Sequence, residues 1–248
     1  WHFNLYKFFM ASKARLFYPD ELKTGLISKL SKNQSHYIKN VMRLKPGDNI
    51  SLFNSSNGEW EAIIINHKND LTEFEIKQFS RNEKEQKNLW LAFSPIKKNP
   101  QDMMLQKTTE LGIKKFIPII CERSVVREIN TVRAKKIIIE ASEQSNRTSV
   151  PEISKIQHLN DFLKKFPDDG KIIFCDINYK GEFLKNILSS QNPLCILIGP
   201  EGDFSEKERQ LIVDNNKTVS LSLSRNILRA ETAATAATSI LNYHLNFK

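Results

Sequence analysis

The pattern of apolar and polar residues divides the chain into two parts with different periodicities. In the first part, short apolar runs alternate with tight turns, which predicts strands at 15–18, 50–53, 60–66 and 72–79. One helix is predicted there, over 33–42, with Tyr37, Ile38 and Val41 on its apolar face. Short strands, tight turns and a single helix are typical of a small β-barrel, so residues 11–79 are predicted to form one.

The second part alternates apolar strands with helices. A polar stretch over 80–88 precedes it and is predicted to be a linker, which leaves 89–248 as a second domain. Alternation at this spacing predicts an α/β fold with a mostly parallel sheet and helices on both faces. Strands are predicted at 89–93, 115–120, 171–175, 194–198 and 219–223, and helices at 102–111, 131–146, 181–188, from Ser205 onward and after Arg229.

The N-terminal stretch 1–10 is aromatic, but it lacks the basic start, long apolar centre and small-residue cleavage site of a signal peptide. We expect it to be an extension outside the fold; an additional edge strand is the alternative. No apolar run approaches the ~20 residues that cross a bilayer, so no membrane association is predicted.

Charge and cysteine content narrow the classes of function. The net charge is +9 and the pI about 9.4, which favours an anionic partner such as a nucleic acid, although a merely basic protein is the alternative. Arg15, Lys39, Arg43 and Lys45 are candidates for a basic face on the barrel, against the alternative of scattered surface charge. The three cysteines lie far apart, which predicts buried thiols in a reducing compartment and no disulfide or metal site.

Two polar segments follow strands near the C-terminus. Leu194 to Ile198 end at Gly199-Pro200-Glu201-Gly202, and a helix opens at Ser205 with the spacing of a capping box. The other segment follows 219–223 and leads to Arg229 and Glu231. Carboxyl ends of parallel strands are where open α/β sheets bind ligands. Neither segment has the glycine pattern of a Walker loop or of a dinucleotide site.

Together the two segments resemble the SPOUT superfamily of S-adenosylmethionine-dependent RNA methyltransferases. The closer resemblance is to the family that methylates N3 of a uridine in 16S ribosomal RNA. Its first signature, Ile-Gly-Pro-Glu-Gly-Gly-aromatic-Ser, stands here as Ile198-Gly199-Pro200-Glu201-Gly202-Asp203-Phe204-Ser205. Its second, Leu-Gly-x-Arg-Ile-Leu-Arg-x-Glu-Thr-Ala, stands as Leu223-Ser224-Arg225-Asn226-Ile227-Leu228-Arg229-Ala230-Glu231-Thr232-Ala233. Further matches are Gln106-Lys107, Glu110-Leu111-Gly112, Glu143-Gln144-Ser145, Arg147 and Val150-Pro151, and 36–48 resembles the family's PUA-like barrel.

Three positions depart from the pattern. Asp203 and Ser224 replace glycines, and Asn226 replaces an arginine for which Arg225 is a possible substitute. A side chain at a former glycine is costly only where the backbone needs a positive φ. The departures therefore concern the geometry of the loops more than the identity of the cofactor.

The resemblance implies an S-adenosylmethionine-dependent uridine-N3 methyltransferase that acts on 16S rRNA or the small ribosomal subunit. It further implies a cytoplasmic homodimer without a metal, a PUA-like RNA-binding barrel, and a C-terminal domain whose last strands and helix form a trefoil knot, an exception to the rule against threaded chains.

The chemistry suggests roles for individual residues. Loss of the uridine N3 proton places negative charge on the flanking carbonyls, which Arg229 is predicted to stabilise. Glu231 or Glu201 is predicted to accept the proton or orient the arginine, although Glu231 also fits an ordinary first-turn carboxylate. The predicted cofactor-binding residues are Phe174, Asp176, Leu197, Ile198, Gly199, Pro200, Glu201, Gly202, Leu221, Leu223, Asn226, Ile227, Leu228 and Thr232. The predicted RNA-binding residues are Arg15, Arg43, Lys45, Lys107, Arg147 and Arg225, with a plain surface arginine as the alternative for Arg147.

Two other functions remain open at this point. One is a SPOUT methyltransferase with a ribose or another base as its target, which the Asn226 departure keeps in play. The other is a non-catalytic RNA-binding factor in ribosome assembly.

Overall fold

The computed structural model describes residues 13–82, 88–179 and 193–246. The chain forms two compact units, one of residues 1–84 with 146–149 and the other of 85–145 with 150–248. The first division lies inside the predicted linker 80–88, whose opening residues are still strand. The membership of 146–149 in the N-terminal unit was not predicted. The predictions for 1–10 and for a helix at 181–188 fall outside the described residues.

The N-terminal unit is built on a five-stranded sheet with the order β1-β3-β4-β5-β2. β1 pairs with β3 in parallel, and the other pairs are antiparallel. Asn69 and Asp70 both have positive φ, as expected for a tight turn between two antiparallel strands. The elements are β1 (Arg15–Phe17), β2 (Ile27–Lys29), α1 (Lys32–His36), η1 (Tyr37–Val41), β3 (Asn49–Asn54), β4 (Gly58–Lys68) and β5 (Leu71–Arg81).

The helical segment of this unit buries less than its pattern predicted. Ser31 begins α1 with a capping box that includes Gln34. Ile38 is fully buried, but Tyr37 and Val41 are exposed. The prediction of a shared apolar face is wrong for these two residues, because η1 is a π-turn and its wider winding breaks the α-helical spacing. The unit's core lies among the strands and contains Leu16, Ile50, Leu52, Ile64, Phe74 and Ile76.

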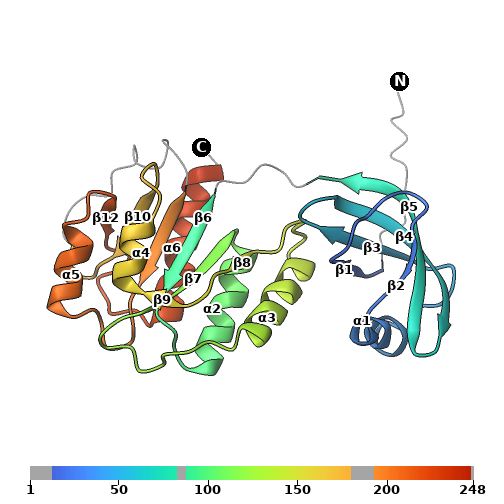
Figure 1. Cartoon of the computed structure of the whole chain (residues 1–248), viewed down its shortest axis with the longest axis horizontal. Coiled ribbons are helices and arrows are strands. Elements are labelled where there is room, and N and C mark those ends of the chain that lie inside the picture. The colour runs from blue at the N-terminus through green and yellow to red at the C-terminus, as the bar shows by residue number, and fades with distance from the viewer. Residues whose placement is uncertain (1–12, 83–87, 180–192, 247–248) are drawn as a thin grey trace, which may run out of the picture. The chain divides into compact units, whose positions relative to one another are not determined.

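The C-terminal unit contains a seven-stranded sheet with the order β12-β10-β11-β6-β7-β8, and β9 also pairs with β7. Every pair is parallel, which confirms the predicted α/β sheet. Its elements in Figure 1 are β6 (Leu89–Phe93), α2 (Lys98–Glu110), β7 (Lys115–Ile120), α3 (Thr131–Gln144), β8 (Glu152–Ile153), β9 (Gln157–His158), α4 (Leu159–Lys165), β10 (Lys171–Cys175), β11 (Leu194–Ile198), α5 (Glu206–Val213), β12 (Thr218–Leu221) and α6 (Ala230–Asn246). β8, β9 and α4 were not predicted.

Alternation along the central strands produces two cores. On β11, Ile196 faces the core shared with α2, α3 and α6, whereas Cys195 and Leu197 face the core shared with α4 and α5. Helices therefore cover both faces of the sheet (Figure 1). Ala234 and Ala237 are fully buried on α6, which contacts β11 and α2. Their small side chains permit this close approach, and the trefoil knot itself stays a prediction.

No helix in the described parts of the chain is both long enough and apolar enough to cross a membrane.

Candidate functional site

The two segments that the sequence singled out leave the sheet at the same edge. β10 lies between β11 and β12, with Phe174 opposite Leu197 and Cys175 opposite Leu221. Just beyond the strands, the Asp176 amide donates to the Leu221 carbonyl at 3.0 Å. Residues 199–204, called the first loop, and residues 222–229, called the second loop, therefore begin on either side of the end of β10. Such an edge is where parallel sheets form ligand sites.

The first loop is packed onto the protein. The Asp203 amide donates to the Pro200 carbonyl at 2.9 Å, closing a turn, and the Phe204 ring is buried against Phe174 with 5.5 Å between ring centroids. A Cβ atom on Gly199 would lie 2.6 Å from the Phe204 ring. The absence of a side chain at Gly199 thus makes room for Phe204.

The structure explains how the backbone tolerates two of the three departures from the family pattern, Asp203 and Ser224. Asp203 has a φ of +60°, a conformation that glycine adopts without cost and that aspartate tolerates better than most residues. Its Oδ1 accepts from the Phe204 amide at 2.8 Å. Ser224 does not have a positive φ, and its Oγ accepts from the Asn226 amide at 3.0 Å. The second loop therefore accommodates Ser224 without strain, and the first loop accommodates Asp203 at a modest cost.

Two residues that brace the first loop were not among the predicted site residues. The Arg123 guanidinium donates to the carbonyls of Gly202 and Phe204, at 3.2 and 3.3 Å. The Glu208 carboxylate accepts from the amides of Ser205 and Glu122, at 3.0 and 2.8 Å. The capping-box spacing predicted the Ser205 contact. The other links join the residues just after β7 to the first loop, through Arg123 and Gly202, and to the start of α5, through Glu122 and Glu208, which are 79 and 86 positions apart. No local spacing could have found them.

The second loop is open by comparison. Arg225, Asn226 and Arg229 are exposed, and Ile227 is 89% exposed. The Arg229 side chain has no hydrogen-bond or ion-pair partner among the residues that the structure describes, whereas its carbonyl accepts from the Ala233 amide at 2.8 Å. Glu231, in the first turn of α6, is only 8% exposed, and its carboxylate has no such partner within the described ranges either. The exposed Arg229 side chain and the neighbouring Glu231 carboxylate make this segment a candidate for binding or catalysis.

Asp176 and Phe174, at the end of β10, have side chains that are occupied within the protein. Asp176 accepts from the Asn178 amide at 2.9 Å and forms an ion pair with Arg209 on α5. Phe174 is buried on Phe204. Any contact of these two residues with a cofactor would therefore use their main-chain groups.

The apolar residues among the predicted cofactor-binding residues fall into separate groups. Leu197 and Ile198 are buried, and strand alternation directs them into the two cores on opposite faces of the sheet. Their side chains therefore do not form one surface for a ligand. The exposed or half-exposed members are Ile227, Leu223 and Leu228, all from the second loop. Of the other predicted cofactor residues, Glu201, Gly202 and Thr232 are exposed and Pro200 and Leu221 are buried.

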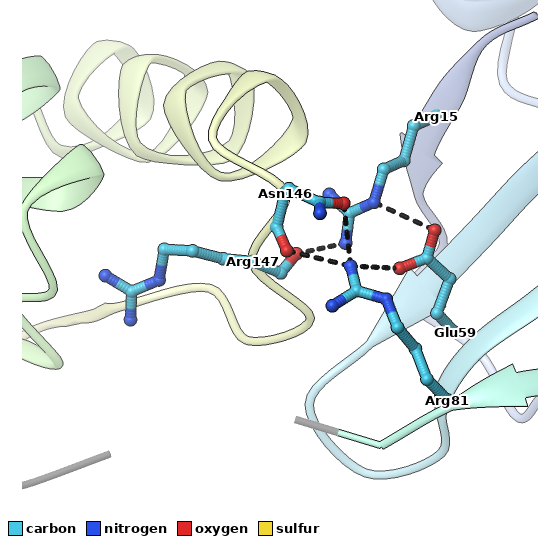
Figure 2. A network of polar contacts seen from close by, with 5 residues as sticks. All are labelled: Arg15, Glu59, Arg81, Asn146 and Arg147. Atoms are coloured by element: carbon cyan, nitrogen blue, oxygen red, sulfur yellow. Dashed lines mark hydrogen bonds and ion pairs between the residues drawn. The ribbon is translucent and has the colours of Figure 1, made fainter. Parts of the chain in front are cut away.

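The predicted RNA-binding residues also differ in their surroundings. Arg43 and Lys45 are exposed on the N-terminal unit, as is Arg225 on the second loop. Lys107 forms an ion pair with Glu110 at 3.0 Å. Arg15 donates to Glu59 and to the Arg147 carbonyl, and Arg147 is only 5% exposed (Figure 2).

Cys121 and Cys195 are buried free thiols, and Cys175 is a half-buried one. Burial raises the pKa of Cys121 to about 12, with a further contribution from the nearby Glu208 carboxylate. Burial also raises the pKa of Cys195. These thiols stay protonated at neutral pH and do not supply a nucleophile.

Two family profiles and several known proteins match this chain. A family profile for an RNA methyltransferase domain matches residues 82–242, and one for an RNA methyltransferase PUA domain matches 30–72. The chain is 37% identical over 211 residues to ribosomal RNA small subunit methyltransferase E of Rickettsia conorii, covering 84% of this chain and 85% of the relative. It is 29% identical to the enzyme of that name from Bacillus subtilis, covering 84% and 86%.

Solved structures of two methyltransferases have the same fold as this chain. That of ribosomal RNA small subunit methyltransferase E from Neisseria gonorrhoeae, bound to S-adenosyl methionine, superposes with a TM-score of 0.84 at 30% identity, covering 92% of this chain and 96% of that one. A putative methyltransferase from Legionella pneumophila in complex with the same cofactor gives a TM-score of 0.82 at 29% identity, with the same coverage.

The fold, the two loops and the matching profiles define the class, an RNA methyltransferase of the SPOUT type with a PUA domain. Within that class, the chain belongs to the ribosomal RNA small subunit methyltransferase E family.

Proposed function

We propose that this protein transfers a methyl group from S-adenosylmethionine to N3 of a uridine in 16S ribosomal RNA. One observation carries the proposal: Arg229, whose exposed side chain has no partner in the described chain, stands two residues before the nearly buried Glu231. Both follow β12, which ends at the edge of the sheet where the first loop begins. The relatives named above, and the cofactor in two of their structures, support the reaction class.

The residues at this edge fit S-adenosylmethionine. Ile227 exposes an apolar side chain that an adenine ring or another subunit would cover. The backbone of the first loop is held in one arrangement by hydrogen bonds such as that from Arg123 to the Gly202 carbonyl. The cofactor supplies an electrophilic methyl on a cationic sulfur, so the reaction requires a held geometry more than a reactive side chain. We propose that the backbone of the first loop binds it, together with Leu223, Ile227 and Leu228 of the second loop.

The protein's chemical task is to favour the deprotonated uridine. As the proton leaves N3, negative charge develops on the two flanking carbonyl oxygens, and in this proposal the Arg229 guanidinium stabilises it. Glu231, or the exposed Glu201, accepts the proton or orients the arginine. Arg229 is thus the principal catalytic residue of the proposal.

Recognition of RNA rests on exposed positive charge. Arg43 and Lys45 on the N-terminal unit and Arg225 on the second loop are accessible to phosphate. The net charge of +9 favours the same partner, either 16S rRNA or the small ribosomal subunit. Affinity is expected to fall as salt rises, because each phosphate contact releases counterions.

The deciding experiment is methyl transfer to deproteinised 16S rRNA and to isolated small subunits, followed by mapping of the modified nucleoside. Methyl at N3 blocks Watson–Crick pairing, so reverse transcription of the product should stop at one uridine. Read-through with a 2′-O-methyl signal would instead identify a ribose methyltransferase. Calorimetry that detects no binding of S-adenosylmethionine would favour a non-catalytic RNA-binding factor.

We further propose that the protein is a homodimer located in the cytoplasm. Met103 on α2, Val132 on α3 and Tyr243 on α6 are exposed apolar residues of the kind that a second subunit would cover. Sedimentation equilibrium tests the dimer, and a monomer at micromolar concentration would contradict it.

A further inference from the structure

Four strands of the N-terminal unit bring together a buried group of charges. Glu59 on β4 lies opposite Arg81 on β5 and opposite Phe53 on β3. Its Oε1 accepts from Arg15 Nε at 3.0 Å and its Oε2 from Arg81 Nη2 at 2.6 Å. The Arg15 guanidinium also stacks over the Phe53 ring, 3.8 Å from its centroid. Both carboxylate oxygens are therefore occupied, and each arginine is fixed in direction.

The same two arginines hold a distant segment of the chain, as Figure 2 shows. Arg81 Nη2 donates to the Asn146 carbonyl at 2.8 Å and to its side-chain Oδ1 at 2.7 Å. Arg15 Nη2 donates to the carbonyl of Arg147. Hydrogen bonds from charged donors are stronger than neutral ones, so these contacts grip consecutive residues. We call the three residues Arg15, Glu59 and Arg81 the clasp.

The conformation of residues 146–149 follows from their own sequence. α3 ends at Gln144, and Asn146 has a φ of +64°, the left-handed conformation that asparagine adopts readily just after a helix. The side chain of Arg147 extends away from Glu59, and its Nη2 donates to Ser149 Oγ at 3.3 Å (Figure 2). The turn thus directs the carbonyls of Asn146 and Arg147 toward the clasp, and the Arg147 guanidinium points away from it.

The segment that the clasp holds is joined to the C-terminal unit at both of its ends. Residues 146–149 belong to the N-terminal unit, but peptide bonds join them to α3 on one side and to the segment leading to β8 on the other. The chain thus passes between the units three times, after Lys84, Ser145 and Ser149. The clasp holds the residues of the N-terminal unit at which the second passage ends and the third begins.

We propose that Arg15, Glu59 and Arg81 are positioning residues for the methyl transfer. By holding 146–149, the clasp couples the unit proposed to bind RNA to the unit that carries Arg229 through two further connections of the chain. This proposal rests on the proposed function, since it concerns delivery of RNA to that site. It assigns Arg15 an indirect role, in keeping with a side chain that is only 13% exposed.

The contacts allow matched variants to be chosen. Arg15 uses two different nitrogens, Nε for Glu59 and Nη2 for Arg147, whereas Arg81 makes all three of its contacts through Nη2. A lysine has one nitrogen with three donors, so Arg81→Lys should retain more function than Arg15→Lys. Asn146→Gly keeps the left-handed backbone and removes only the Oδ1 contact. Arg133→Ala is the control, because it removes another arginine–carboxylate pair, with Asp102 on α2, outside the clasp.

The experiment measures single-turnover methyl transfer, RNA affinity at several salt concentrations, cofactor affinity and thermal unfolding for each variant. We expect Arg15→Lys to lower the methyl-transfer rate at saturating RNA at least tenfold, with RNA and cofactor affinities within about threefold of wild type. Arg81→Lys and Asn146→Gly should lie between it and wild type, and Arg133→Ala should match wild type. Weaker RNA binding with a reduced salt slope and an unchanged rate would show direct phosphate contacts and overturn the proposal, as would unchanged behaviour of every clasp variant.

Hydrogen exchange separates failure of the clasp from failure of the proposed function. Amides of 145–150 should exchange faster in Arg15→Lys than in wild type or Arg133→Ala, whatever RNA is methylated. Unchanged exchange overturns the clasp even if the wild type methylates uridine N3. Faster exchange together with a different methylated product supports the clasp and contradicts the proposed function instead.

Discussion

The two loops at the sheet edge differ in how the rest of the protein holds them. The first loop is fixed by its own turn, by the buried Phe204 ring, by the Arg123 guanidinium and by the Glu208 carboxylate. In the second loop, the local hydrogen bonds include that from the Asn226 amide to Ser224, and the side chains of Ile227 and Arg229 are exposed. The contrast applies to the part of the chain that the structure describes.

The difference corresponds to two tasks. Binding of a small, flexible cofactor is stronger when the protein groups are already in place, because less freedom is lost on binding. A loop that must also meet a large RNA gains from side chains that are not yet committed to internal partners. We therefore infer that the first loop mainly serves the cofactor and that the second serves both cofactor and target.

The strongest test of this division is Arg229→Ala. Removing one group that stabilises developing charge typically costs about 10²–10³-fold in rate. We expect that loss in single-turnover methyl transfer, with cofactor affinity by calorimetry within a few-fold of wild type. Arg225→Ala, in the same loop, should instead raise the KM for RNA and preserve the rate at saturation. Full activity of Arg229→Ala would contradict the proposed mechanism.

A second test compares the two glycines of the first loop. Gly199→Ala would place a Cβ 2.6 Å from the Phe204 ring, whereas Gly202→Ala would place one 3.5 Å from the nearest atom, in Arg123. Overpacking should destabilise the former by about 1–3 kcal/mol and weaken cofactor binding about tenfold. Gly202→Ala is the control and should bind within a few-fold of wild type. Equal losses in the two variants would show that the ligand, and not Phe204, requires the glycines.

A smaller effect is expected from Ile227→Ser. The side chain is 89% exposed, so the free energy of unfolding should change by less than about 0.5 kcal/mol. Cofactor affinity should fall several-fold if the ligand covers this apolar surface. Ile27→Ser on β2 of the N-terminal unit, where the side chain is 58% exposed, is the matched control. Unaltered cofactor affinity would show that Ile227 does not contact the cofactor and would favour a role for it in the subunit interface.

The smallest effect concerns the departures from the family pattern. Asp203→Gly should relieve the left-handed backbone and raise the free energy of unfolding by at most about 1 kcal/mol, since glycine also gains freedom in the unfolded chain. Ser224→Gly, at a position without positive φ, should lower it slightly or leave it unchanged. Urea unfolding measures both. A stabilising Ser224→Gly would show that the second loop is more strained than its backbone indicates.

Much of the architecture could be predicted from local patterns. The parallel strands, the capping box at Ser205 and Glu208, and the buried cysteines follow from spacing and hydrophobicity within a few residues. The short elements β2, β8 and β9 could not be predicted, because two or three residues carry no usable period and depend on the strands they pair with. The Tyr37 and Val41 prediction failed because a π-turn changes the helical winding locally.

The features of the site also separate into those that local sequence predicts and those that depend on tertiary contacts. The sequence by itself determined the family, the two loops and the polar residues they carry, because those signals lie within short continuous motifs. Only the tertiary structure decided that Leu197 and Ile198 belong to opposite cores, that Arg123 and Glu208 brace the first loop, and that Arg15 and Arg81 hold residues 146–147. These contacts join residues between about 60 and 130 positions apart along the chain, or depend on which face of a strand a side chain occupies. Such relations exist only once the strands have paired.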